Sequence, residues 1–311
     1  MLDFKKVRRK IYYYCAYVFS KLVLILPYKF SVGFLSSLFG RIAYYVAIDG
    51  ARSAKKNLKK CFHEKPNEDI KKMVKKMFSL EAKVFFELAN FPRMNSKFMR
   101  NIAFVEKLDH IQESLKNGKG VLFASAHTGN WEITAAIMAE MGIPVNVVAK
   151  KIYIDGLNDM LVEYRKSKNI KVILRETPGS GVKLLRALKR GETIAMLIDQ
   201  DVDVAGVFVN FFGQKAWTPS GLAALALKTE ADVYVAFDQR IDEYKHKTVV
   251  NGPINFIKTD DFKKDVKKLT QDITSILEEH IKMYPEQWVW FHDRWKTKPE
   301  QVLKKDRYEF L

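Results

Sequence analysis

Between residues 118 and 283, short apolar runs alternate with amphipathic stretches, and this alternation constrains the fold more than any other feature of the chain. The short runs have the length of buried strands, and the stretches between them repeat apolar side chains at helical spacing. We expect strands at 120–126, 144–149, 170–174, 193–198, 232–238 and 247–250. We expect helices at 133–141, 155–168, 179–190, 219–228 and 261–283, with a loop between 198 and 219. This order predicts an α/β fold, a layered sandwich with a mostly parallel central sheet flanked by helices.

Residues 51–100 are predicted to form a helical lead-in to this sheet. A run that opens at Asn67 places apolar side chains at helical spacing, namely Ile70, Met73, Val74, Met77 and Leu80. The sequence shows no internal repeat, low-complexity segment or flexible linker. We therefore expect one α/β domain at 51–311, preceded by a separate N-terminal segment at 1–50.

The N-terminal segment differs in composition from the rest. Basic residues precede an apolar and aromatic run at 11–26, and a second apolar run at 30–48 contains Arg41 and two glycines. A membrane-spanning helix needs roughly 20 apolar residues, so the first run is marginal for a span. Three interpretations stay open: a retained anchor, a shallow hairpin or interfacial helices on a membrane, and ordinary core helices.

The chain is strongly basic, with a formal net charge of +17 over 311 residues. Such a charge attracts polyanions, which include nucleic acid, anionic lipid headgroups and acidic carrier proteins. No segment resembles an RNA-binding aromatic strand, so we expect no nucleic-acid partner. An anionic membrane surface or an acidic protein is the preferred partner.

His127 and Glu132 are the first candidates for chemistry. The strand at 120–126 would place His127 at its carboxyl end, with Glu132 in the first turn of the following helix. From there the carboxylate could hold one imidazole nitrogen and leave the other free to take a proton from a hydroxyl. The ordinary alternative is a glutamate that favours the helix dipole without any catalytic role.

Other kinds of site are less consistent with this segment. No second ligand stands at a spacing that would complete a metal site with His127. Ser125 lacks the flanking glycines of a nucleophilic serine, and strand packing explains it better. The two cysteines, Cys15 and Cys61, lie far from this segment. We therefore expect neither a metal nor a covalent acyl-enzyme.

Several polar residues end or follow the predicted strands: His127, Asp199, Asp201 and Gln239. Substrates of open α/β sheets bind beyond the carboxyl ends of the strands, so these side chains are expected to gather at one edge. Arg165 is the candidate donor to an oxyanion or contact to a phosphate, although an exposed helix arginine is the alternative. Backbone amides at the start of the helix after His127 could serve the oxyanion instead.

The spacing of His127 and Glu132 matches the His-x4-Asp/Glu signature of the lysophospholipid and glycerophosphate acyltransferase superfamily. Further blocks follow in the order of one branch: Tyr164-Arg165, Ile198 to Asp201, Phe211-Phe212-Gly213 with Ala216, Thr218 and Gly221, Gln239-Arg240, and Pro285 to Trp295. Over about residues 10 to 300, the chain resembles the lipid A biosynthesis (lauroyl and myristoyl) acyltransferases.

This resemblance implies a membrane-associated enzyme that moves a fatty acyl group from an acyl thioester, of acyl carrier protein or coenzyme A, to a hydroxyl of a lipid A precursor or related glycolipid. His127 would act as the base and Glu132 would stabilise the imidazolium. No metal or other cofactor is implied, because the thioester already carries an activated acyl group. A mannosylated phosphoinositide is the alternative acceptor, and a lipid thioesterase or hydrolase is a more distant alternative. The resemblance also favours membrane attachment by residues 1–50. A basic N-terminus followed by one true span would export the catalytic domain, away from any cytosolic acyl carrier. We therefore expect a non-spanning or re-entrant attachment at the inner membrane, with the catalytic domain facing the cytoplasm.

The remaining candidates have orienting or substrate-binding interpretations. Asn130 is expected to shape the turn, and Asp199 and Asp201 could orient Arg165 or the acceptor, or only cap loops. Gln239 and Arg240 are expected to bind or orient substrate. For Arg240 and Arg294, phosphate contacts and salt bridges both stay open. The segment 211–213 offers either a wall for an acyl chain or core packing. Trp288, Trp290 and His292 could close one side of the site, but a structural role is the preferred interpretation.

Overall fold

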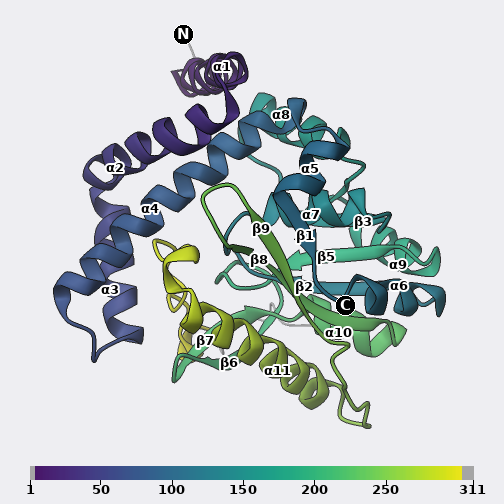
Figure 1. Ribbon diagram of the computed structural model, residues 1–311. Coiled ribbons are helices and arrows are strands. Elements are labelled where there is room, and N and C mark those ends of the chain that lie inside the picture. Colours follow the sequence, from purple (N-terminus) through teal and green to yellow (C-terminus); the bar gives the residue numbers. More distant parts are fainter. Residues whose placement is uncertain (1–3, 303–311) are drawn as a thin grey trace.

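The structure is a computed structural model that describes residues 4–302. Within this part of the chain, a seven-stranded sheet has the order β1-β9-β8-β2-β5-β3-β4 (Figure 1). Its strands are β1 (Ala103–Val105), β2 (Val121–Ser125), β3 (Val145–Ala149), β4 (Lys171–Leu174), β5 (Thr193–Leu197), β8 (Asp232–Arg240) and β9 (His246–Asn251). All neighbouring pairs are parallel except β8 with β9. The prediction of an α/β fold with a mostly parallel central sheet flanked by helices is confirmed.

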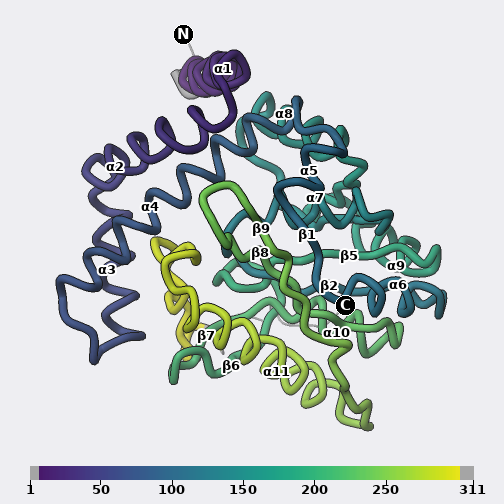
Figure 2. Tube along the Cα trace, in the orientation of Figure 1, coloured from purple at the N-terminus to yellow at the C-terminus, as the bar shows by residue number. Residues whose placement is uncertain are grey.

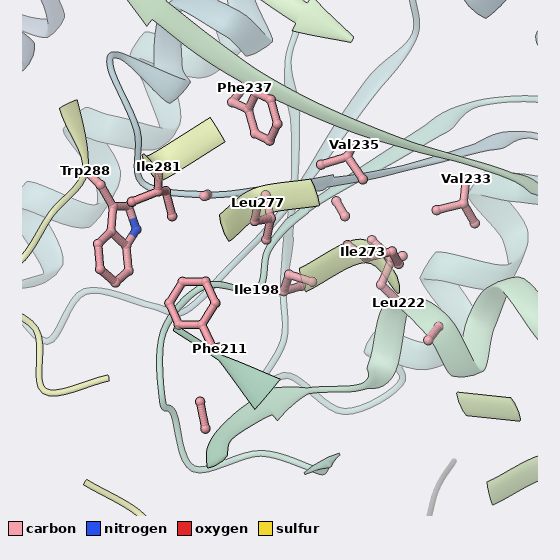
Figure 3. Packing of buried hydrophobic residues seen from close by; sticks show 14 of the residues in the cluster. Ile198, Phe211, Leu222, Val233, Val235, Phe237, Ile273, Leu277, Ile281 and Trp288 are labelled. Atoms are coloured by element: carbon pink, nitrogen blue, oxygen red, sulfur yellow. The ribbon is translucent and has the colours of Figure 1, made fainter. Parts of the chain in front are cut away.

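Helices cover both faces of this sheet, because alternate side chains of each central strand point to opposite sides. Val121 and Phe123 of β2 belong to one hydrophobic cluster, which also contains residues of α5 (Ser96–Ile102), α6 (Leu108–Lys116) and α7 (Trp131–Glu140). Leu122 and Ala124 belong to a second cluster, with residues of α9 (Ser180–Lys189), α10 (Gly221–Thr229) and α11 (Phe262–Met283). Figure 3 shows this second cluster, where Val235 and Phe237 of β8 lie beside Leu277 of α11. The buried apolar run of β2 is thus explained by burial on both faces.

A β-hairpin occupies part of the segment that we expected to be a loop. It consists of β6 (Gly206–Phe211) and β7 (Gln214–Pro219), joined at Phe212 and Gly213. Both turn residues have positive φ, at 52° and 71°, as a two-residue hairpin turn that matches the strand twist requires. Phe-Gly is not the usual Asn-Gly signal for such a turn, which explains why the pattern was missed. Phe211 packs against Trp288 and Trp295 in the core, so core packing is the correct alternative for this residue.

The N-terminal region is helical and packs along one long helix. The helices are α1 (Phe4–Ile25), the π-helical η1 (Phe30–Leu35), α2 (Ser36–Val46), α3 (Ile48–Cys61) and α4 (Asn67–Asn90). The first four pack against α4, and Figure 2 shows the group along one side of the molecule. The remaining elements are η2 (Phe91–Arg93), α8 (Asp155–Lys166), η3 (Pro285–Gln287) and α12 (Pro299–Val302). The side chain of Arg93 donates hydrogen bonds to carbonyls at the end of α1, including that of Leu26 at 2.7 Å, and so fixes α1 to the rest of the chain.

Large apolar side chains remain exposed along these first helices. We call them the N-terminal apolar face: Val7, Ile11, Tyr12, Tyr14, Tyr17, Val18, Leu22, Ile25, Phe30, Phe34, Leu38, Phe39, Ile42, Tyr45, Val46 and Ile48. Among the described residues, no single helix has both the length and the apolar character of a membrane span. One pair, Phe30–Val46 with Ile48–Cys61, meets that requirement jointly but bends by 88°. The predicted division at residue 50 stays a prediction, and residues 1–3 and 303–311 of its two parts lie outside the described chain.

Candidate active site

The loop between β2 and α7 places His127 at the carboxyl end of β2. Gly129 has a φ of 55°, and a Cβ at this position would clash with Asp238, so glycine is required for the loop to pass. Asn130 then caps α7, because its side-chain oxygen accepts hydrogen bonds from the amides of Glu132 and Ile133 at 3.1 and 3.2 Å. The turn is therefore held from both sides, and His127 is presented on a rigid support.

Asp199, which follows β5, holds His127. The imidazole Nδ1 lies 2.9 Å from Oδ1 of Asp199, and the backbone amide of His127 donates to Oδ2 at 2.8 Å. Trp288 donates its indole N–H to the same Oδ2 at 2.7 Å. The carboxylate thus fixes the imidazole through its ring and its backbone.

The expectation that Glu132 would hold the imidazole is wrong. The physical reason is the strand order: β5 lies beside β2, so the residue after β5 reaches His127, whereas Glu132 points toward α8. There Arg165 donates to both carboxylate oxygens of Glu132, at 3.0 and 2.6 Å. Asp199 therefore orients His127 rather than Arg165, which also corrects the expected partner of Arg165. Whether Glu132 and Arg165 take part in catalysis stays a prediction.

The two partners shift each other's pKa. Burial favours neutral forms, but the charge of His127 and its hydrogen bonds lower the pKa of Asp199 to about 2. For His127 burial acts to lower the pKa, and the charge and hydrogen bond of Asp199 outweigh it and raise the pKa above its ordinary value. An ionised Asp199 has no proton to donate, so Nδ1 of His127 carries the hydrogen and Nε2 is left as the basic nitrogen.

The basic nitrogen of His127 is not engaged. Within residues 4–302 the structure gives Nε2 no hydrogen-bond partner, and the side chain is 21% exposed. The ring of Trp131 meets the imidazole edge to face at 4.8 Å between centroids. A base that is held at one nitrogen and free at the other can accept a proton from a bound substrate.

A cluster of buried charged side chains packs beneath the β2–α7 loop and is hydrogen-bonded to it through Asn130. We call it the support cluster, and it consists of Glu87 on α4, Asp238 and Arg240 at the end of β8, and His246 at the start of β9. Arg240 donates to both oxygens of Glu87 at 2.8 and 2.6 Å, and His246 lies between Asp238 at 2.8 Å and Glu87 at 3.2 Å. Asn130 connects this cluster to the site, because its amide N–H donates to Asp238 and its side-chain NH2 donates to Glu87.

In the support cluster, neighbouring opposite charges shift the pKa values of Glu87 and His246 more than burial does. Burial raises the pKa of Glu87, but Arg240 and His246 outweigh it and hold that pKa well below its ordinary range. Burial lowers the pKa of His246, while the charge of Asp238 acts more strongly and the net result is a rise to about 8. Sequence reasoning missed Glu87 and His246. The sequence did contain a signal for Glu87: it is a carboxylate on the apolar face of the predicted helix that begins at Asn67.

The remaining predicted site residues have structural partners. Arg240 forms the buried ion pair with Glu87, so the salt-bridge alternative is correct for it. Asp201 accepts hydrogen bonds from the backbone and side chain of Thr297. Arg294 is buried and donates to the carbonyl of Trp217 and the hydroxyl of Thr218, which again excludes a phosphate contact. The side chain of Gln239 is buried and makes no hydrogen bond to His127 or Asp199 in the described chain.

An apolar cavity lies among the N-terminal helices, α4 and the loop at Phe291. It has a volume of about 490 Å³ and is lined by Phe19, Phe39, Ala43, Ala47, Gly50, Phe78, Glu81, Ala82, Phe85, Phe86 and Phe291. The loop that supplies Phe291 is tied to the site, because the amide of Val289 donates to the carbonyl of His127 at 3.2 Å. Glu81 is the one acidic residue among the side chains that line this cavity.

Ser125 has no geometry for nucleophilic attack. Its hydroxyl is buried without a hydrogen-bond partner, so His127 does not activate it. A triad nucleophile lies within hydrogen-bond reach of its base. The arrangement therefore favours direct attack by an external hydroxyl over a serine hydrolase.

Comparisons with known proteins agree with this geometry. The model of the bacterial lipid A biosynthesis acyltransferase family matches residues 1–297. Similar relatives include a phosphatidylinositol mannoside acyltransferase of Mycolicibacterium smegmatis, 26% identical over 83% of this chain and 84% of the relative. The lipid A biosynthesis lauroyltransferase of Escherichia coli is 26% identical over 90% of each chain, and a lipid A biosynthesis acyltransferase of Haemophilus influenzae is 24% identical over 79% of this chain and 76% of the relative. The resemblance drawn from the sequence is confirmed: the chain belongs to the bacterial lipid A biosynthesis acyltransferase family and is an acyltransferase.

Proposed function

We propose that the protein transfers a fatty acyl group from the thioester of acyl carrier protein or coenzyme A to a hydroxyl of a lipid A precursor or a related glycolipid. The observation that carries this proposal is the His127–Asp199 pair, which leaves a basic nitrogen free at the carboxyl edge of the sheet. The family supplies the reaction type, and the pair supplies a base for the acceptor hydroxyl.

In this mechanism Nε2 of His127 takes the proton of the acceptor hydroxyl as its oxygen attacks the acyl carbon. Asp199 stabilises the imidazolium through the hydrogen bond to Nδ1. When the tetrahedral intermediate collapses, the carbon–sulfur bond breaks and the imidazolium returns its proton to the leaving sulfur. The ester forms without a covalent intermediate on the protein.

The apolar cavity beside α4, which we call the acyl cavity, supports a fatty substrate. Its walls are mainly aromatic and aliphatic side chains from α1, α2, α4 and the loop at Phe291. Burial of each methylene group of a chain in such a space contributes about 0.8 kcal/mol. We propose that the acyl chain lies there with its carbonyl group toward His127.

The N-terminal apolar face supports attachment to a membrane. Its aromatic and aliphatic side chains are exposed on α1 and α2, and the chain is strongly basic. Apolar burial and attraction to anionic headgroups act together at an interface. We propose that this region lies on the cytoplasmic leaflet of the inner membrane, with the site facing the cytoplasm.

The acceptor has two candidates, because the similar relatives act on different lipids. Their names specify lipid A biosynthesis in one group and phosphatidylinositol mannoside acylation in the other, at equal identity in the two best-covered cases. We place the lipid A precursor first because the family model carries that description over residues 1–297.

Acyl transfer by the purified protein tests the proposal. The assay pairs acyl carrier protein and coenzyme A thioesters with a lipid A precursor and with a mannosylated phosphoinositide. We expect ester formation with one acceptor, and its loss in His127→Ala. Release of free fatty acid that is independent of any acceptor would instead indicate a thioesterase and contradict the proposal.

A further inference from the structure

Glu81 is a buried carboxylic acid that the mechanism above does not use. It lies on α4, is 8% exposed and lines the acyl cavity. In the part of the chain that the structure describes, it forms no hydrogen bond and no ion pair. A buried polar group without a partner is costly, which makes a ligand its natural partner.

The surroundings of Glu81 favour its neutral form. Burial raises the pKa of Glu81 to about 8, and the charges of His127 and Arg240 lower it only in part. Arg240 is already neutralised by Glu87. The neighbours across the cavity are apolar: Phe19 on α1, Ala43 on α2 and Phe291 on the C-terminal loop. At neutral pH the carboxyl group therefore keeps a proton that it can donate in a hydrogen bond.

Most of the other candidate donors for an oxyanion already bind partners within the protein. Arg165 donates to both oxygens of Glu132. At the start of α7, the amide of Asn130 donates to Asp238, and those of Glu132 and Ile133 donate to Asn130. Among the described residues, Nη1 of Arg165 and the amide of Trp131 make no hydrogen bond, so these two groups compete with Glu81 for the oxyanion.

We propose that Glu81 is a catalytic residue whose neutral carboxyl group donates a hydrogen bond to the carbonyl oxygen of the acyl thioester and to the oxyanion that forms from it. This inference rests on the proposed acyl transfer. Glu81 lines the cavity that we propose for the chain, and the loop that supplies Phe291 to the same cavity is hydrogen-bonded to the carbonyl of His127 through Val289. A donor on this wall is available to an acyl carbonyl that leaves the cavity toward His127. A carboxylic acid kept neutral by an apolar site is a known way to stabilise an oxyanion.

The reaction balances with Glu81 in this role. The acceptor oxygen forms a bond to the acyl carbon, its proton passes to Nε2 of His127, and the carbonyl electrons move onto the oxygen. Glu81 keeps its proton throughout and strengthens its hydrogen bond as charge develops. On collapse the carbon–sulfur bond breaks, and His127 returns the proton to sulfur.

Two substitutions separate donation from packing. Glu81→Gln keeps a neutral donor of similar shape, whereas Glu81→Leu removes the donor and keeps the volume. We expect Glu81→Leu to lower kcat by about 10²–10³-fold, the effect of removing one oxyanion donor, and Glu81→Gln to lose much less. Glu68→Gln is the matched control, because Glu68 lies exposed on the same helix.

The pH profile gives a readout that packing does not change. In the wild type, kcat should fall as the pH rises through about 8, because Glu81 loses its donor proton. In Glu81→Gln this alkaline limb should disappear. An infrared difference spectrum between wild type and Glu81→Gln should show a neutral carboxyl band at pH 7 that fades above pH 8.

Three outcomes would overturn the proposal. They are an unchanged kcat in a folded Glu81→Leu protein, an alkaline limb that persists in Glu81→Gln, and absence of the carboxyl band. A change only in the preferred chain length would assign Glu81 to the cavity wall instead. Failure of the wild type to transfer any acyl group would sink the proposed function, and the infrared band would still report the state of Glu81.

Discussion

Two histidines of this protein are bound to an aspartate in the same way and differ at the other nitrogen. His127 and His246 each place Nδ1 within 2.9 Å of a carboxylate oxygen, of Asp199 and Asp238 respectively. His246 is 1% exposed and its Nε2 lies 3.2 Å from Glu87, whereas the Nε2 of His127 has no partner in the described chain. A histidine–aspartate pair therefore does not define a base; the unoccupied second nitrogen does.

The two pairs also differ in their net charge. His246 lies between two carboxylates with Arg240 nearby, so its protonated form completes a neutral group of four charges. His127 has one bound carboxylate and an unbound Nε2, so a substrate can supply the missing partner. The first arrangement stabilises the fold, and the second one is prepared for proton transfer.

The largest difference is expected when each histidine is replaced by glutamine. His127→Gln should lower acyl transfer by about 10²–10⁴-fold and leave the protein folded, because Asp199 keeps its bonds from Trp288 and the backbone. His246→Gln should instead lower the melting temperature, since it leaves Glu87 and Asp238 short of positive charge. Steady-state kinetics and thermal unfolding of the two variants test both expectations. The comparison fails if both variants lose activity at unchanged stability.

A second prediction concerns the support cluster alone. Glu87→Gln should lower the free energy of unfolding by about 3–5 kcal/mol, because it leaves Arg240 as an uncompensated buried charge. Urea unfolding measures this loss. Glu243→Gln is the control, because Glu243 pairs with Lys83 at a half-exposed position where an ion pair contributes little. Equal losses in both variants would contradict a special role for the cluster.

The sequence predicted the fold better than it predicted the partners. The periodicity in 118–283 predicted the bounds of most strands and helices to within a few residues, because burial of one or two faces produces a regular spacing of apolar residues along the chain. The order of strands in the sheet is not local, and it decides that the residue after β5, rather than Glu132, reaches His127. Glu81, Glu87 and His246 were missed for the same reason: their roles depend on contacts between distant segments.

A third prediction distinguishes Asp199 from Glu132 as the partner of His127. The base must be neutral, so activity falls as the pH drops through the raised pKa of His127. Asp199→Asn removes the main charge that raises this pKa, and the acid limb of kcat/KM should move to lower pH while kcat falls by about 10²–10⁴-fold. Glu132→Gln should move the limb less, because its carboxylate is bound to Arg165. A larger shift in Glu132→Gln would restore Glu132 as the partner of the imidazole.

The smallest expected effect is the pH dependence of stability that His246 contributes. Its pKa is about 8 in the folded protein and about 6.5 in an unfolded chain, so the folded state holds the proton more tightly. This stabilisation is complete below pH 6.5 and is lost as the pH rises through 8, by about 2 kcal/mol. Asp238 and Glu87 raise the pKa and Arg240 lowers it, so the effect reports the whole support cluster. Urea unfolding between pH 6 and 9, with the imidazole resonance of His246 followed by NMR, measures it. An imidazole that titrates below pH 6.5 would show that the cluster does not hold a protonated histidine, and the contrast with His127 would then rest on the occupied nitrogen alone.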